Sequence, residues 1–162
     1  MRHRFSICLI VIAVALLPGC SETKPSYDDV RAEAIAVMQQ VNDLIPGPTT
    51  PRPRPEFDPF GCGSHPLSGE GSDSAFFTGY WEIEVSNEVD VPSFIADLPA
   101  TLGDDWVVED VGVDVPFAQV HLLQKSSRIS LTVEHRDRND KKGIDVLVMS
   151  RCGLQSKATP AL

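Results

Sequence analysis

The chain has too few cysteines, too little positive charge and too few recognisable motifs for several common classes of protein. Its four cysteines form no Cys-x-x-Cys pair and no cluster with histidine, so no metal centre is predicted. A Walker or Rossmann phosphate loop and a serine nucleophile elbow are both missing. With 14 Lys and Arg against 23 Asp and Glu, nucleic acid is not expected as a partner.

The apolar run near the N-terminus is also short. It extends from Phe5 to Leu17, whereas a transmembrane helix needs about 20 apolar residues. Arg2 and Arg4 precede it, and a positive segment followed by an apolar run of this length is typical of an export signal.

The run ends in Leu17-Pro18-Gly19-Cys20, which resembles the lipobox of bacterial lipoproteins. Leu17, Gly19 and Cys20 match that pattern, while Pro18 departs from the usual small residue. We therefore predict a signal peptide over residues 1–19, cleavage between Gly19 and Cys20, and lipid on the Cys20 thiol. The alternative is an ordinary secretory signal in which this cysteine is incidental.

Lipid on Cys20 predicts a protein held on the outer, extracytoplasmic face of the cell membrane. Residues 20–25 form a short tether, and residues 26–155 are long enough for a single domain with its own core. Removal of Arg2 and Arg4 with the signal shifts the formal charge from -9 to -11. An acidic domain on a short tether follows, with a flexible tail over residues 156–162.

Two cysteines remain once Cys8 is cleaved away and Cys20 is lipidated. In an exported protein an even remainder predicts a disulfide, here between Cys62 and Cys152. A reactive or metal-bound pair of thiols is the alternative.

The mature chain begins with the signs of an amphipathic helix. Ser26 and Asp29 have the spacing of a capping box. Apolar residues then recur at helical spacing, namely Val30, Ala34, Val37, Val41 and Leu44. Because the polar face is acidic, packing on the protein's own domain is favoured over a helix lying on the membrane.

Residues 46–59 contain six prolines and predict an extended, stiff connector that cannot enter the interior of a sheet. A ligand for the aromatic groove of a partner is the alternative interpretation.

From Phe76 the pattern changes to strands. Trp81, Ile83 and Val85 alternate with polar residues, and a helix is expected from Pro92 to Gly103. Strands are then expected over residues 106–113, 117–125, 129–133 and 144–148, with a charged loop over residues 136–143. The predicted fold is α+β, with an N-terminal helix and one further helix packed on a mostly antiparallel sheet of about five strands.

A family resemblance follows from the order of these features. A helix ending in Ile45-Pro46-Gly47, an extended segment, one cysteine, a mixed region and a second cysteine near the C-terminus resemble the LppA-like small lipoproteins of actinobacteria. The resemblance implies a lipoprotein of a family whose function is largely unknown, and it gives no catalytic residue to carry over.

Chemistry-bearing residues are scattered. His65 lies in a Gly/Ser loop, His121 is expected to point away from its apolar strand neighbours, and His135 has only Asp137 and Asp140 as candidates for a weak metal site. No catalytic residue, metal or cofactor is predicted.

The sequence therefore favours a non-catalytic binding or accessory module of the cell envelope, with a membrane anchor and an envelope protein as candidate partner. Alternatives are a small-ligand carrier and an enzyme whose site is assembled from distant residues. A deep apolar pocket would favour the carrier. A His/carboxylate cluster with a perturbed pKa would favour the enzyme. An exposed apolar patch would favour the binding module.

Overall fold

The structure is a computed structural model that describes residues 24–63, 73–138 and 141–156. The predicted cleavage and lipidation site at Gly19 and Cys20 lies outside the described residues, as do His65 and Asp140. Neither helix in the described part of the chain has a stretch long and apolar enough to span a membrane.

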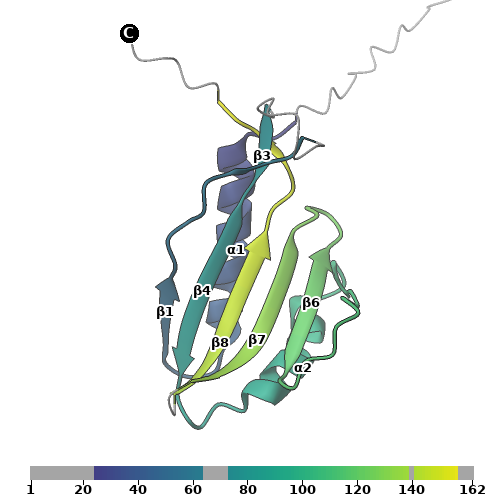
Figure 1. Cartoon of the computed structure of the whole chain (residues 1–162). Coiled ribbons are helices and arrows are strands. Elements are labelled where there is room, and N and C mark those ends of the chain that lie inside the picture. The colour runs from purple at the N-terminus through teal and green to yellow at the C-terminus, as the bar shows by residue number, and fades with distance from the viewer. Residues whose placement is uncertain (1–23, 64–72, 139–140, 157–162) are drawn as a thin grey trace, which may run out of the picture.

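The described part of the chain folds as predicted into an α+β structure with two helices and a large antiparallel sheet (Figure 1). Its elements are α1 Tyr27–Leu44, β1 Thr49–Pro53, β2 Phe60–Gly61, β3 Ser74–Phe76, β4 Thr78–Val85, α2 Val91–Leu102, β5 Trp106–Val108, β6 Gln119–Gln124, β7 Ser130–Arg138, β8 Lys141–Met149 and β9 Gly153–Leu154. Six strands form one antiparallel sheet in the order β1-β4-β8-β7-β6-β5, and three form a smaller antiparallel sheet in the order β2-β3-β9. The sheet is thus larger than the five strands expected.

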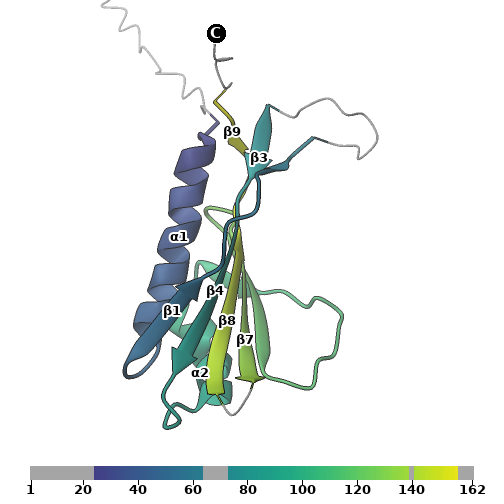
Figure 2. The same cartoon turned by 60° about the vertical axis from the view of Figure 1, so that its left-hand side comes forward.

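Both helices cover the same face of the six-stranded sheet. Figures 1 and 2 show α1 along β4 and β8, with α2 at the other side of that face, where it contacts β5, β6 and β7. The core between these layers is fully apolar and includes Met38, Val41, Ile83, Ile95, Leu122, Leu131, Ile144 and Val146, each at most 2% exposed. Burial of one face leaves the other without a helical cover.

The caps of the helices explain where they begin and end. Ser26 and Asp29 form the expected capping box, in which the Ser26 side chain accepts a hydrogen bond from the Asp29 N–H. Asp90 caps α2, and Gly103 ends it with a φ of 90°. Pro99 lies inside α2, which continues past it to Leu102.

The proline-rich segment forms an edge strand, which the connector prediction missed. β1 pairs antiparallel with β4, and the Arg54 N–H beside it donates to the Tyr80 carbonyl at 2.9 Å. Since successive N–H groups of a strand point in opposite directions, the prolines at positions 51 and 53 direct their missing N–H away from β4. Alternate prolines are therefore compatible with the sheet edge, although not with its interior.

Cys62 and Cys152 form the predicted disulfide, with their Cα atoms 6.2 Å apart. The bond joins the end of β2 to the start of β9, which are the two edge strands of the smaller sheet. β9 pairs with β3, and the Leu154 N–H donates to the Pro25 carbonyl at 2.8 Å. The end of the domain is thus fixed beside the start of α1.

Two strand predictions need correction. The strand expected over residues 106–113 ends at Val108, because the Asp110 side chain accepts a hydrogen bond from the Gly112 N–H at 2.7 Å and Gly112 turns with a φ of 67°. The charged loop expected over residues 136–143 is instead the paired ends of β7 and β8. In the register Asp137 lies opposite Lys142, whose ammonium donates to the Asn87 and Val89 carbonyls at 3.0 and 3.1 Å.

Reduction of the disulfide is expected to lower the free energy of unfolding. Cys62 and Cys152 are 90 residues apart, and in the chain-entropy model closing such a loop contributes roughly 4–5 kcal/mol. Urea unfolding of the oxidised and reduced protein measures the difference. Equal midpoints in the two states would contradict a stabilising role.

Candidate functional site

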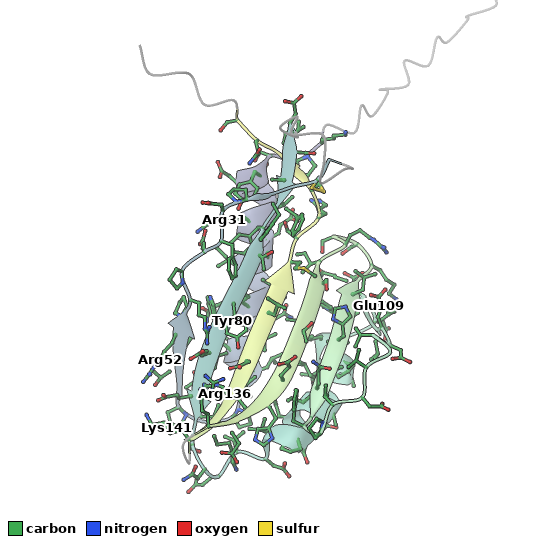
Figure 3. All side chains as sticks on the ribbon, viewed as in Figure 1. Arg31, Arg52, Tyr80, Glu109, Arg136 and Lys141 are labelled. Atoms are coloured by element: carbon green, nitrogen blue, oxygen red, sulfur yellow. A yellow bond between two sulfur atoms is a disulfide. The ribbon has the colours of Figure 1, made fainter. Side chains whose placement is uncertain are left out.

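The uncovered face of the six-stranded sheet carries most of the chemistry of the described residues. Figure 3 looks onto this face, where Tyr80 of β4 and Arg136 of β7 come from the two strands that flank β8. The register brings Tyr80 opposite Leu147 and Glu82 opposite Asp145, and it places Glu134 on the other side of Asp145. Polar residues of β4, β8, β7 and β6 therefore form a continuous row across the strands, which Gln119 completes opposite Glu134. We call this surface the open face.

A well-buried ion pair lies at the centre of the open face. Arg136 Nε and Asp145 Oδ1 are 2.7 Å apart, and each side chain is only 12% exposed. The two atoms attract as charges but are not aligned as a hydrogen bond. The Tyr80 hydroxyl donates to Asp145 Oδ2 at 2.6 Å, and burial together with this bond raises the pKa of the tyrosine.

A second set of charges connects the open face to the edge strand. Arg54 lies over the Tyr80 ring at 4.8 Å from its centroid and donates from Nε to Glu82 at 2.8 Å. This hydrogen bond lowers the pKa of Glu82. Arg52 pairs with Glu84 at 3.1 Å, so the edge is held to β4 by side chains as well as by the backbone.

His121 is the centre of a third group, on β6. Its Nδ1 lies 2.8 Å from the Thr132 hydroxyl, while its Nε2 lies 3.3 Å from Ser130 Oγ and 3.7 Å from Glu109 Oε2. A hydroxyl, an imidazole and a carboxylate are the components of an acid–base site. Here, however, Ser130 and Glu109 share one ring nitrogen, and Thr132 stands in the middle of a strand rather than on an exposed turn. The arrangement orients the imidazole more readily than it activates a nucleophile.

The segment between β5 and β6 borders the open face with exposed apolar residues. Figure 2 shows this segment projecting from the sheet on the side away from α1. The exposed apolar side chains of this segment and of the last residue of β5 are Val108 (62%), Val111 (50%), Val113 (65%) and Phe117 (41%). These four residues are the β5–β6 patch. Single exposed apolar residues are ordinary, but four within one short segment indicate a contact surface.

Two open hollows lie beside this patch and share Phe117. One, of about 380 Å³, is lined by the segment itself and by Gln119 and His121. The other, of about 310 Å³, is lined by charged residues that include Glu134, Arg136 and Asp145. Neither has the deep apolar lining expected of a small-ligand carrier.

The structure brings few of the sequence-derived candidates together. His121 points to the open face as predicted, opposite the fully buried Leu122. His135 belongs to β7 rather than to a loop, and no group of three or more His, Cys, Asp or Glu side chains in the described part of the chain could hold a metal ion.

Sequence reasoning missed the residues that the register assembles, namely Tyr80, Arg136 and Asp145. Asp145 gave the clearest signal, since it is a charged residue among Ile144, Val146 and Val148. Its partners lie on other strands, and the strand order was not predictable.

Comparison of the chain with models of protein families, with curated proteins and with solved structures found no match.

Removal of one member of the central ion pair is expected to destabilise the fold. In Asp145→Ala, Arg136 loses its counter-charge and the Tyr80 hydroxyl loses its acceptor, which is expected to lower the free energy of unfolding by about 3 kcal/mol. Arg136→Ala should lower the free energy of unfolding by a similar amount. The double variant should lower it by less than the sum of the two single-variant effects. Urea unfolding of all four proteins measures the coupling.

The matched control is the exposed Arg52 and Glu84 pair, whose side chains are 58% and 27% exposed. Its coupling should be roughly 0–1 kcal/mol. Additive effects at Asp145 and Arg136 would show that the central pair is not coupled.

The Arg54 and Glu82 contact predicts a pH dependence. A lowered pKa means that folding favours the ionised carboxylate, so the contribution is complete above the ordinary value of 4.5 and is lost as the pH falls through the lower folded value. NMR titration of Glu82 should show this pKa returning toward 4.5 in Arg54→Ala. An identical titration in both proteins would refute the assignment.

Proposed function

We propose that the protein is a lipoprotein anchored by lipid to the outer, extracytoplasmic face of the cell membrane, where it acts as a non-catalytic binding or accessory module of the cell envelope. The sequence supports the anchor through Arg2, Arg4, the apolar run and Leu17-Pro18-Gly19-Cys20. Lipid on Cys20 would leave a domain with one helix-covered face and one open face close to the membrane.

The observation that carries the binding role is the exposed β5–β6 patch beside the open face. Val111 and Val113 are half or more exposed, although burial of apolar side chains is the main source of stability in water. Acidic Glu109, Asp110 and Asp114 lie within the same segment, so the surface combines apolar contact with negative charge. Such a combination suits a protein surface better than a small apolar ligand.

The anchor is tested by Cys20→Ala. Without the thiol no thioether to lipid can form, so the variant should leave the membrane fraction or remain unprocessed, with the signal still attached. Fractionation and intact mass measure both outcomes. A variant that is processed and still remains in the membrane fraction, as the wild type does, would contradict the lipoprotein proposal.

The binding role is tested with a photo-crosslinking amino acid in the native envelope. Placed at Val111 or Val113, it should capture the same protein, and Phe117→Ser should reduce that capture because the patch loses its aromatic member. The control position is Gln40, which is exposed on α1 on the other side of the sheet. Equal capture from Gln40 would count against the proposed surface.

A further inference from the structure

A second apolar surface lies on the small sheet, away from the β5–β6 patch. It consists of Phe57, Phe60, Phe76 and Leu154, and we call it the tip patch. Phe57, Phe60 and Leu154 are 58%, 48% and 40% exposed. The Phe60 ring stacks on Phe76 with centroids 5.5 Å apart, and the Phe57 ring lies 6.2 Å from Phe60. The aromatic rings form one cluster.

The register places the strand residues of the tip patch on one side of the small sheet. Phe60 pairs with Phe76, and Leu154 pairs with Ser74, which shares a face with Phe76 because strand side chains alternate. The other side carries Ala75, which is fully buried, and β3 contacts α1 there. The patch therefore faces outward while the opposite side is part of the fold.

The tip patch lies at the end of the domain where the tether enters. The Leu154 N–H donates to the Pro25 carbonyl at 2.8 Å, and Leu154 forms a parallel bridge with Ser26. Phe60 is on the strand two places across from β9, roughly 10 Å away at the usual strand spacing. Figures 1 and 2 show β3 at the N-terminal end of α1.

The length of the tether limits how far this end can stand from the lipid. Cys20 and Pro25 are five positions apart, and a fully extended chain of that length spans at most about 18 Å. Exposed Phe and Leu side chains held this close to a bilayer can reach the boundary between headgroups and acyl chains, where they bury apolar surface.

We propose that the tip patch docks on the bilayer that holds the lipid on Cys20, an inference that rests on the proposed anchor. The part of the membrane that the tip patch contacts is its uncharged interfacial region. Arg31 next to this surface is paired with Glu56, and the mature chain carries a formal charge of -11, so attraction to anionic headgroups does not drive the contact. The contact is driven instead by burial of the apolar side-chain area of the tip patch.

Docking through the tip patch fixes the orientation of the domain. β4 begins beside the small sheet and runs away from it for eight residues, a length of about 26 Å. The turn after β4 lies at the far end. The segment before β6 starts level with the beginning of β4 and extends along the sheet toward the far end, because β6 runs back from there. The β5–β6 patch would then remain accessible while the tip patch is covered.

The experiment uses the full lipidated chain in phosphatidylcholine vesicles that contain brominated acyl chains, which quench tryptophan at close range. A tryptophan reporter is introduced by Phe57→Trp at the tip patch or by Glu88→Trp in the turn at the far end of β4. The wild-type emission from Trp81 and Trp106 is subtracted. Vesicle flotation first shows whether the chain is anchored.

Docking predicts that the Phe57→Trp reporter loses roughly half of its emission and the Glu88→Trp reporter very little. Adding Phe60→Ser should reduce quenching of the first reporter, and including anionic phosphatidylglycerol should not increase it. A chain that does not float contradicts the proposed anchor. A floating chain whose two reporters are quenched equally, or whose tip reporter is not quenched, overturns the docking and leaves the tip patch to a protein partner.

Discussion

Burial of a single face of the six-stranded sheet is the constraint from which the other features follow. The apolar stripe of α1 covers β4 and β8, and α2 covers the strands on the other side of that face. Both helices pack on this face and neither covers the open face. The side chains of the open face must therefore be stable in contact with water. They achieve this by pairing, with Arg136 and Asp145 at the centre and Arg54 and Glu82 toward the edge. Paired charges give an ordered open face.

The positions of the two apolar patches complete this arrangement. The tip patch lies on the small sheet beside the start of α1, while the β5–β6 patch lies on the segment that projects from the other side of the six-stranded sheet. With the proposed anchor on Cys20, at most about 18 Å of chain would precede Pro25, so the tip patch would contact the membrane and the β5–β6 patch would contact a partner protein.

Local sequence patterns predicted the elements whose signal is local. The spacing of Val30, Ala34 and Val37 gave α1, and the alternation around Ile83 gave β4. The pairing of Cys62 with Cys152 followed from elimination. β1 was missed because prolines argue against strands unless their missing N–H points out of the sheet, a condition that depends on the partner strand. The paired ends of β7 and β8 were interpreted as a loop because charged residues suit either environment. The central ion pair depends on strand order, which no local pattern encodes.

The most direct measurement of the central claim is the intact mass of the protein extracted from the membrane fraction. The proposal predicts a chain that begins at Cys20, carries the added mass of a diacylglycerol on that residue, and lacks two hydrogens because Cys62 and Cys152 are joined. A chain that begins at Met1, or one cleaved at another position without added lipid, would contradict it.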